Sequence, residues 1–363
     1  MKLCCKDCFS DAYLQAFLLK NGRKGACHYC KSKSQYCIST SDLIELFRPI
    51  INLYEPLQAL ISAKEYKKLV KKGEVSYLWD KLQHDWGIFN ISRRKVRELL
   101  VSRLTPKDSR HLLRHHVELR GQYEADDEDS PKAKWLEFSE ELKTRNRFFP
   151  GKEINLSQLE SRLQFLERQI AIKTPLYRSR NSLLGEKYEP REMGKPPVKK
   201  TKSNRANPPG ISYLYLANDT ETALAETRPS LMDRVTIGKF LVVEEMELID
   251  LRDISPFQFV IRVSPSQLAM DEDFEELVGH IDYLKMLGAD LSKPVNPKEA
   301  DLEYLPSQYL CEFIKNKGWD GVMYGSSLAE GYNIALFSDT KLKCVQTLLY
   351  EVNRTDFKYT LIT

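Results

Sequence analysis

Three side chains of different chemistry follow one another in the stretch 204–229, namely Arg205, Tyr215 and Glu226. The planar guanidinium of an arginine can hold a pyrophosphate through two parallel hydrogen bonds. A carboxylate can stabilise the positive charge that develops on a ribose when its glycosidic bond breaks. A tyrosine can stack on a flat ring or hydrogen-bond a sugar hydroxyl. Together the three predict a site that holds a dinucleotide and breaks its glycosidic bond.

The elements around these residues are a turn, a strand and a short helix. The Pro-Pro-Gly run at 208–210 is a turn signal, and the alternation in 211–217 predicts a strand. Asp219 or Thr220 can then cap a helix over 221–228, which ends before a proline. Turn, strand and helix in this order can place the arginine, the tyrosine and the glutamate around one pocket.

Six of the eight cysteines lie in the first 37 residues. Two Cys-x2-Cys pairs, Cys5 with Cys8 and Cys27 with Cys30, have the spacing of a zinc ribbon or treble clef. Four thiolates can hold one Zn2+ tetrahedrally at about 2.3 Å, and they leave no open position for catalysis. We therefore predict one structural Zn2+ in place of disulfides or free thiols. Two further cysteines of the cluster could each replace a ligand: Cys4 and Cys37.

Length and composition bound the class of protein. A chain of 363 residues with 42% hydrophobic and 29% charged residues predicts two or more soluble domains. No apolar run is long enough to span a bilayer, and the N-terminal residues lack the apolar stretch of a signal peptide. We therefore expect a cytoplasmic protein without a membrane partner. The net charge of +4 does not demand a nucleic-acid partner, although 195–205 is basic and 124–129 acidic.

The middle of the chain, 39–172, predicts one helical domain, because apolar residues recur there at helical spacing without a Gly/Pro-rich linker. Arg110 and His115 in this domain match the R-x4-H pattern typical of HEPN-type RNases, in which both side chains act on a phosphate from one helix face. The alternative is a solvated helix face. Helices are expected over 9–19, 41–50, 57–73, 78–89, 94–104, 110–119, 135–142 and 156–172.

The last part of the chain, 173–363, alternates short strands with short helices. No strict βαβ repeat and no G-x-G-x-x-G motif is present, which argues against a Rossmann fold. A mixed α+β sheet domain is the expected fold. Strands are predicted over 176–178, 211–217, 235–243, 247–251, 321–324 and 334–337, and helices over 271–287 and 306–317.

Four segments of this part resemble the RES family and occur in the family's order. One segment alone would be a weak match, but four in order across 173–363 are specific. The segments are Leu-Tyr-Arg-Ser-Arg at 176–180, the run from Arg205 through the strand to Ala217, Ala-Leu-Ala-Glu-Thr-Arg-Pro at 223–229, and Gly-Trp-Asp-Gly-Val-Met-Tyr-Gly-Ser-Ser at 318–327, which leads to Asn-Ile-Ala-Leu-Phe at 333–337.

The resemblance implies a fold similar to ADP-ribosyltransferases such as diphtheria toxin. It also implies destruction of NAD+ at the nicotinamide–ribose bond, by hydrolysis or with phosphate as acceptor. This chain departs from the family at Asn204 and Ala206, which flank the arginine where the family usually has a glycine and an aromatic residue. The implied catalytic residues are Glu226, Arg178 and Ser326, and the implied NAD+-binding residues are Arg205, Tyr215, Arg180 and Asn333.

The expected organisation is multidomain, with a zinc knuckle over 1–38, a HEPN-like helical domain over 39–172 and a RES domain over 173–363. Helical modules of this kind resemble those found ahead of RES domains. We expect an NAD+-consuming toxin or defence effector, with an antitoxin or regulatory protein and a second copy of the chain as candidate partners. Two alternatives stay open: an RNase that uses Arg110 and His115, and a zinc-containing adaptor without activity. The basic run 195–202 is either a flap that attracts the dinucleotide or a solvated loop.

Overall fold

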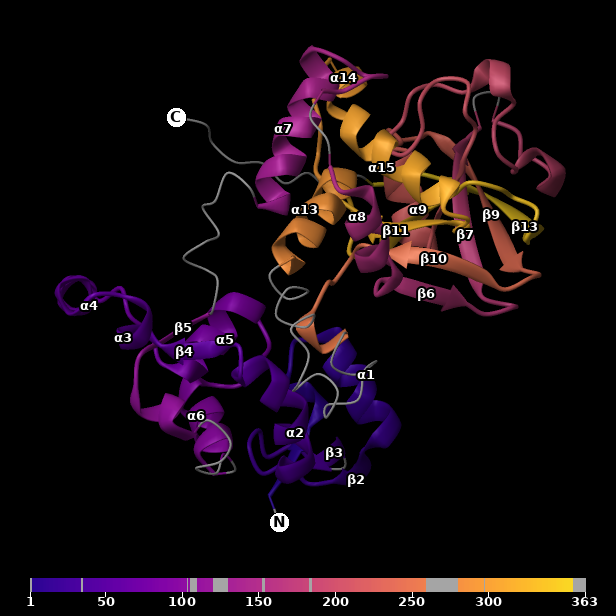
Figure 1. Cartoon of the computed structure of the whole chain (residues 1–363). Helices are drawn as coiled ribbons and strands as arrows, with labels where there is room; N and C mark the ends of the chain where they lie inside the picture. Colours follow the sequence, from indigo (N-terminus) through magenta and orange to yellow (C-terminus); the bar gives the residue numbers. More distant parts are fainter. Residues whose placement is uncertain are drawn as a thin grey trace. The chain divides into compact units, whose positions relative to one another are not determined.

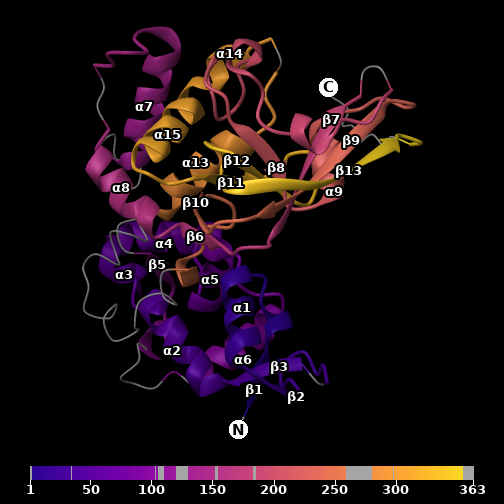
Figure 2. The same ribbon diagram turned by 90° about the vertical axis from the view of Figure 1, so that its right-hand side faces the viewer.

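The computed structural model describes residues 2–33, 35–102, 104, 110–119, 130–151, 154–182, 185–258, 280–296 and 298–354. Contacts divide the chain into two compact units, each made of two stretches of sequence. The N-terminal unit consists of Met1–Ser130 and Asp253–Asp282, and the sheet unit of Pro131–Arg252 and Tyr283–Thr363. Figures 1 and 2 show the elements of each unit from two sides.

The N-terminal unit begins with a small antiparallel sheet in the order β1-β3-β2. Asp11 caps the first helix by accepting a hydrogen bond from the backbone of Leu14 at 2.7 Å. The helix predicted over 9–19 is confirmed, shifted by a few residues. The elements are β1 (Leu3–Cys5), the 3-10 turn η1 (Lys6–Cys8), α1 (Ala12–Asn21), β2 (Arg23–Gly25) and β3 (Gln35–Ser39).

Helices follow in this unit in the regions that the apolar spacing predicts, except that the single helix expected over 57–73 is broken into two by extended backbone at residues 61–62. Ser39 caps α2 by accepting a hydrogen bond from the backbone of Asp42 at 3.1 Å. Gly73 ends α4 at φ 73°, a left-handed conformation that glycine adopts without strain. The helices are α2 (Thr40–Ile51), α3 (Leu57–Leu60), α4 (Ala63–Lys72), α5 (Leu78–Trp86) and α6 (Arg93–Val101).

The prediction of a helix over 110–119 is wrong. The structure has the 3-10 helix η2 (Arg110–Arg114) and then the strand β5 (Val117–Leu119), which pairs antiparallel with β4 (Tyr54–Pro56). Apolar residues alternate with a glutamate in β5, as in a strand. Pairing with the distant strand β4 also satisfies the backbone hydrogen bonds of β5, so this segment forms a strand although its apolar spacing suggests a helix. The helical region is therefore not all-α. The acidic run 124–129 lies outside the described residues.

Residues 253–258 follow the sheet unit in sequence but pack inside the N-terminal unit. Phe257 is fully buried, and its ring centroid lies 4.9 Å from that of Phe47. The hydroxyl of Ser255 donates a hydrogen bond to Asp11, the residue that caps α1. A segment from far along the chain thus completes the core of the N-terminal unit.

The sheet unit is built on an eight-stranded sheet in the order β13-β9-β7-β8-β12-β11-β10-β6. Neighbouring strands are antiparallel, except that β10 and β11 are parallel. The α+β fold expected for this part is confirmed, whereas the sequence pattern predicts neither β6 nor β13. The strands are β6 (Glu167–Ile170), β7 (Pro175–Asn181), β8 (Leu214–Ala217), β9 (Arg234–Val242), β10 (Met246–Asp250), β11 (Gly321–Gly325), β12 (Tyr332–Leu336) and β13 (Leu342–Glu351).

The helices of this unit differ from prediction at two places. The helix predicted over 156–172 ends at Gln164, because 167–170 pairs with β10 as the edge strand β6. Of the helix predicted over 271–287, the part before 280 lies outside the described residues. The helices are α7 (Pro131–Thr144), α8 (Leu156–Gln164), α9 (Thr220–Glu226), α13 (Ile281–Ser292), α14 (Ala300–Glu303) and α15 (Leu305–Asn316).

Helices α7 and α8 belong to the compact sheet unit, although the sequence analysis assigns them to the helical domain. Phe138 of α7 packs edge-on against Tyr309 of α15, with ring centroids 4.8 Å apart. Lys143 at the end of α7 donates a hydrogen bond to Glu303 at 2.9 Å. The compact units therefore part near residue 130, and the division into three domains at 38 and 172 stays a prediction.

The two faces of the large sheet carry different side chains. One face is an apolar core over which Tyr188 packs, and the other is approached by α9, at β7 and β8, and by α15, at β11. The core residues are Ile170, Leu176, Met193, Leu214, Leu216, Phe240, Val242, Met246, Leu248, Met323, Ile334 and Leu336.

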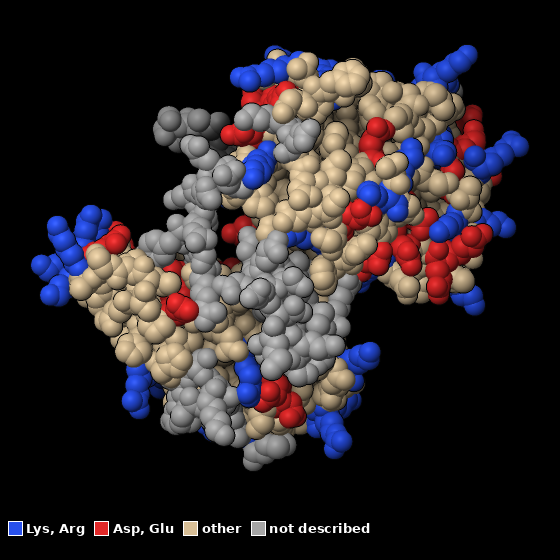
Figure 3. Space-filling view, in the orientation of Figure 1, with Lys and Arg blue, Asp and Glu red and all other residues tan. Residues whose placement is uncertain are grey.

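Charged side chains gather most clearly on α4, which contributes no buried residue to its unit. Its exposed lysines form the blue tip of the N-terminal unit in Figure 3: Lys64, Lys67, Lys68, Lys71 and Lys72. Elsewhere on the visible face blue and red side chains are mixed. None of the helices in the described part of the chain has the length and apolarity to cross a membrane.

Candidate active site

Strand pairing gathers a set of polar side chains on the face of the sheet opposite the apolar core. Residues that lie directly across from each other in paired strands share a face. Ala217 lies across from both Tyr177 and Asn333, and Asn333 lies across from Tyr324. Tyr215, two residues before Ala217, therefore shares this face as well. Four strands, β7, β8, β12 and β11, thus present their side chains to one space.

A cavity of about 250 Å³ lies on this face. It collects five of the residues that the sequence analysis names, namely Glu226, Arg205, Tyr215, Asn333 and Arg178, and Ser326 contacts Glu226. Ligand sites combine aromatic walls with a few convergent polar groups, and this cavity has both. The lining residues are Tyr177, Arg178, Ser179, Asn204, Arg205, Tyr215, Leu216, Ala217, Ala223, Glu226, Thr227, Tyr324 and Asn333.

Glu226 is the last residue of α9, and two donors fix its carboxylate. The amide of Asn333 donates to Oε1 at 2.6 Å, and the hydroxyl of Ser326 donates to the same oxygen at 2.7 Å. Ser326 is itself held, because its hydroxyl accepts hydrogen bonds from the backbone of Leu328 and Ala329. Among the described residues Oε2 has no partner, and the side chain is exposed. One carboxylate oxygen is anchored and the other is available.

Tyr215 offers its ring to the cavity, while its hydroxyl is already used. The hydroxyl donates to Oδ1 of Asn207 at 2.6 Å and accepts from the backbone of Ala206 at 3.3 Å. Burial raises the pKa of Tyr215 well above its usual value, so the phenol stays protonated. The residue thus ties β8 to the loop that carries Arg205.

Arg205 lies on a loop that α15 holds in place. The hydroxyl of Ser307 donates to the carbonyl of Arg205 at 2.6 Å, and the buried amide of Gln308 donates to the carbonyls of Asn204 and Asn207 at 2.8 and 3.1 Å. The guanidinium donates to the carbonyl of Lys293 and lies 5.6 Å from the ring of Tyr304. An arginine so placed keeps further N–H groups for an anion.

Arg178 borders the cavity, but its side chain belongs to the opposite face of the sheet. It lies across from Gly238, where an added Cβ would meet Met193 of the apolar core. Its guanidinium donates to the carbonyl of Met193 at 2.9 Å and to that of Gly194. Burial lowers the pKa of Arg178 to about 10. The structure therefore does not bring this guanidinium to Glu226.

Arg180 shares the face of Arg178, two residues along the same strand. It donates to the carbonyl of Glu192 at 2.7 Å and stacks 4.1 Å from the ring of Tyr188. Their role beside NAD+ stays a prediction, but in the structure both arginines of β7 anchor the loop that begins the basic run, on the opposite face of the sheet from Tyr177. The reason is alternation: the cavity side of β7 is taken by Tyr177 and Ser179.

Sequence reasoning misses Tyr177, Ser179, Thr227 and Tyr324 as cavity residues. Ser179 and Thr227 share a hydrogen bond of 3.1 Å, which joins β7 to the residue after Glu226. Tyr324 lies within a quoted family segment, two residues before Ser326. The signal for it is the alternation in 321–324, which places Tyr324 and Val322 on one face once β11 is known.

The cysteine cluster has the geometry of a tetrahedral thiolate site. Cys5, Cys8, Cys27 and Cys30 present four sulfurs that all lie within 4.8 Å of one another. The Sγ atom of Cys5 lies 3.8 Å from that of Cys8 and 3.4 Å from that of Cys30, and the Sγ atoms of Cys8 and Cys27 are 3.5 Å apart. Four sulfurs about 2.3 Å from one ion would be roughly 3.8 Å apart, so the set fits Zn2+. The chain can therefore hold a metal ion here.

The two further cysteines of the cluster are not part of this four-residue group. Cys4 and Cys37 are both buried, and they lie on the paired strands β1 and β3. The thiol of Cys37 donates to the carbonyl of Gly25 at 3.6 Å. The pair thus packs in the small sheet beside the group of four.

Arg110 and His115 do not lie on one α-helix as expected. Arg110 begins the short 3-10 helix η2, and His115 follows its end and is exposed. The side chain of Arg110 is outside the described part of the chain. An R-x4-H site is expected on one face of an α-helix, and the α-helix predicted over 110–119 does not form.

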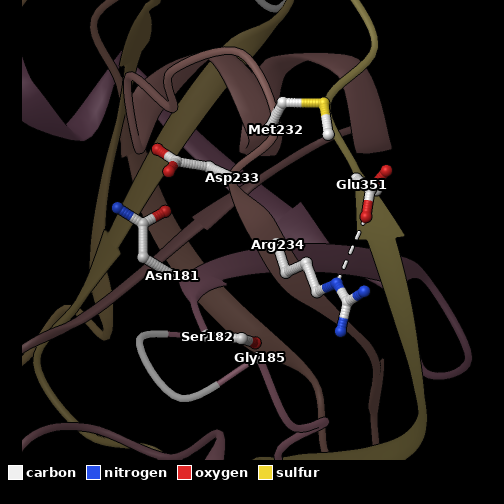
Figure 4. Close-up of a pocket in the computed structure, with 7 residues that line it drawn as sticks. All are labelled: Asn181, Ser182, Gly185, Met232, Asp233, Arg234 and Glu351. Carbon is white, nitrogen blue, oxygen red and sulfur yellow. Dashed lines mark hydrogen bonds and ion pairs between the residues drawn. The ribbon is translucent and has the colours of Figure 1, made fainter.

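A second cavity, of about 460 Å³, lies where β7, β9 and β13 meet (Figure 4). Arg234 and Glu351 pair across it at 3.2 Å. The hydroxyl of Ser182 is hydrogen-bonded to Thr236 at 2.8 Å, and Asp233 accepts from the backbone of Ser230 at 2.7 Å. These polar groups already have hydrogen-bond or ion-pair partners within the protein, so the smaller cavity around Glu226 is the better candidate for an active site.

The match to a known protein family lies within residues of the sheet unit, apart from the segment 253–282. Among solved structures, the crystal structure of the M.tuberculosis MbcT-MbcA toxin-antitoxin complex is similar over 54% of this chain and 94% of its own chain, with 13% sequence identity and a TM-score of 0.32. No curated protein matches. Residues 175–359, just over half of the chain, match the family model of the RES domain. This protein therefore belongs to the RES domain family.

Proposed function

We propose that the sheet unit breaks the nicotinamide–ribose bond of NAD+ and that Glu226 carries this reaction. The observation that carries the proposal is the carboxylate of Glu226, with Oε1 held by Ser326 and Asn333 and Oε2 available at a cavity lined by tyrosines. Family membership supports the choice of substrate, because Arg205, Tyr215, Glu226 and Asn333, all from segments that resemble the family, line this cavity.

The chemistry requires little more than charge at the right place. When the C1′–N1 bond breaks, its electron pair goes to the nicotinamide ring, which leaves as a neutral base and needs no proton. The ribose becomes an oxocarbenium ion, and a carboxylate nearby stabilises its positive charge. An acceptor oxygen then bonds to C1′ and loses its proton to solvent. With water the sum is NAD+ plus water to ADP-ribose, nicotinamide and one proton.

The fixed oxygen of Glu226 matters as much as the available one. Two donors on Oε1 hold the carboxylate before substrate arrives, so no reorganisation is needed when charge develops. Tyr215 supplies a ring on which the flat nicotinamide can stack. Arg205 is the arginine of the cavity with N–H groups to spare for the pyrophosphate, and the loop hydrogen bonds to Ser307 and Gln308 hold it there.

The proposal includes one structural Zn2+ at Cys5, Cys8, Cys27 and Cys30. Four thiolates complete its coordination, so the ion would support the fold of the N-terminal segment and take no part in the reaction on NAD+.

The test is nicotinamide release from NAD+ by the full chain. Glu226→Gln should lower kcat by roughly a hundredfold or more and leave NAD+ affinity within a few-fold, because the charge acts in the transition state. Glu221→Gln is the matched control, since Glu221 is an exposed glutamate at the start of the same helix. Equal turnover in the Glu226 variant, or intact NAD+ with the unmodified protein, would overturn the proposal.

The same incubation separates the remaining predictions. With phosphate present, a phosphorylated ADP-ribose identifies phosphate as the acceptor, and ADP-ribose alone identifies water. A parallel incubation with RNA tests the RNase alternative, in which His115→Ala should abolish cleavage. Growth arrest on expression, relieved by Glu226→Gln, is expected of a toxin or defence effector. An antitoxin that restrains it, and self-association, stay predictions.

A further inference from the structure

Tyr215 and Tyr324 both line the cavity, but they offer it different groups. The hydroxyl of Tyr215 already donates to Asn207 and accepts from the backbone of Ala206. A phenol has one proton to donate, and here that proton is used within the protein. Tyr215 is therefore left with its ring as the group that can meet a ligand.

Tyr324 is placed beside the groups that hold Glu226. It lies directly across from Asn333 in the pairing of β11 with β12, and the amide of Asn333 donates to Glu226 at 2.6 Å. Residues in such a position have Cβ atoms about 5 Å apart on the same face. The side chain of Tyr324 is only 4% exposed, yet it lines the cavity.

The hydroxyl of Tyr324 has no hydrogen-bond partner among the residues that the structure describes. The hydroxyl of Tyr213 is also without a partner, but it is buried away from solvent and Tyr213 does not line the cavity. Burial, with the charge of Glu226 as the next cause, raises the pKa of Tyr324 well above its usual value. The group is therefore a neutral phenol with a proton to donate.

A polar group that is almost buried and unpaired within the protein needs a partner from outside. Water can serve in the free protein, and a ligand hydroxyl can replace it without loss. Glu226 must approach the sugar carbon at which the bond breaks, and Tyr324 lies across from Asn333, which holds Glu226, so its hydroxyl is placed to meet the hydroxyls of the same sugar. A neutral phenol suits a sugar hydroxyl because neither group carries charge.

We infer that the hydroxyl of Tyr324 hydrogen-bonds a hydroxyl of the ribose next to nicotinamide, and so positions that sugar against Glu226. This inference rests on the proposed function. It divides the two tasks of a tyrosine at this site: Tyr215 stacks through its ring, and Tyr324 binds the sugar through its oxygen. The consequence is selectivity for substrates whose reacting sugar keeps its hydroxyls.

The first experiment removes one oxygen atom. Tyr324→Phe should lower kcat/KM for NAD+ by roughly three- to tenfold, the usual worth of a hydrogen bond between neutral groups. Tyr213→Phe is the control, because it removes another unpartnered hydroxyl from a residue that does not line the cavity, and its kcat/KM should stay within twofold of the unmodified protein. Melting temperatures of both variants show whether folding is affected.

The second experiment removes the partner from the substrate. NAD+ analogues that lack the 2′- or the 3′-hydroxyl of the nicotinamide ribose are compared with NAD+ on both proteins. One analogue should lose its penalty, relative to NAD+, in Tyr324→Phe, as a double-mutant cycle requires for interacting groups. Penalties that are the same in variant and unmodified protein for both analogues would overturn the inference.

Failure of the inference and failure of the proposed function give different results. If NAD+ cleavage depends on Glu226 but both analogues behave identically with Tyr324→Phe, the inference fails alone. If the unmodified protein leaves NAD+ intact, the proposed function fails first. If Tyr324→Phe does not fold, the unmodified protein still decides, because equal kcat/KM for NAD+ and both analogues leaves Tyr324 no sugar hydroxyl to recognise.

Discussion

The cavity around Glu226 and the cysteine cluster both gather side chains that could do chemistry, but they are held together in different ways. The four cysteines come from two short knuckles within residues 5–30. The cavity draws on four strands, one helix and a loop spread over 177–333. A metal ion can hold four thiolates together even in a short segment that has few other stabilising contacts. The cavity has no such centre, so it depends on sheet register and on a clamp of hydrogen bonds.

The largest effect should come from that clamp. Ser326→Ala and Asn333→Ala should each lower kcat by roughly tenfold or more, because each removes a hydrogen bond to a charged oxygen. Their effects should not add, since both act on Oε1 of Glu226. Ser327→Ala, at the exposed neighbouring position, is the control in the nicotinamide-release assay. Strictly additive losses would mean that the two residues act on different groups.

The next effect separates the two faces of the sheet. Arg205→Ala should raise KM for NAD+ by roughly tenfold, as expected when a charged hydrogen bond to a phosphate is lost. Arg178→Ala should instead lower the melting temperature by several degrees, because it frees the carbonyls of Met193 and Gly194. Steady-state kinetics and thermal melts of the two variants measure KM and melting temperature and so distinguish the two roles. A raised KM with unchanged melting in Arg178→Ala would place its guanidinium in the site after all.

A third prediction concerns the cysteine cluster alone. The full chain should contain about one zinc, and Cys27→Ser should lose it and melt earlier in the N-terminal unit. Elemental analysis and thermal melts check this, with Cys344→Ser of the sheet unit as control. At 20 °C the variant should keep NAD+ turnover within a few-fold. If Cys27→Ser instead lowered NAD+ turnover at 20 °C by far more than a few-fold, the cavity would depend on the cysteine cluster.

The smallest effect is expected at Tyr215. Tyr215→Phe keeps the ring and removes the hydrogen bonds to Asn207 and Ala206, so the melting temperature should fall by a few degrees. KM should change by less than about threefold if the ring is what meets the nicotinamide. Calorimetry and steady-state kinetics measure the two quantities. A tenfold rise in KM at unchanged stability would return the sugar-binding task from Tyr324 to Tyr215.

The cysteine spacing, the cap of α9 and most strands could be predicted from the sequence, because each depends on residues close together in the chain. Asp219, for example, caps α9 as expected and so fixes where Glu226 lies. The roles assigned to Arg178 and Arg180 could not be checked in this way. Alternation says that the two arginines share a face, but only pairing with Gly238 and Thr236 says which face that is.

Distant pairing also explains the elements that the sequence does not reveal. β6 and β13 are edge strands whose spacing suggests no clear period, and each forms because a neighbour offers an unpaired backbone. β5 forms beside β4 for the same reason. In each case the deciding contact joins segments far apart in the chain, which local propensity does not report.

The segment 253–258 gives the protein a fixed order of assembly. The ribosome releases residues 1–130 well before Phe257, yet Phe257 belongs to the core of the N-terminal unit. Until that ring has been made, Phe47 lacks one of its aromatic neighbours and the core of the unit lacks a buried side chain. By then much of the sheet unit, Glu226 included, has already been made. The N-terminal unit therefore cannot complete its core until residues 253–258 have been made, and a cut near residue 130 would take Phe257 away from that core.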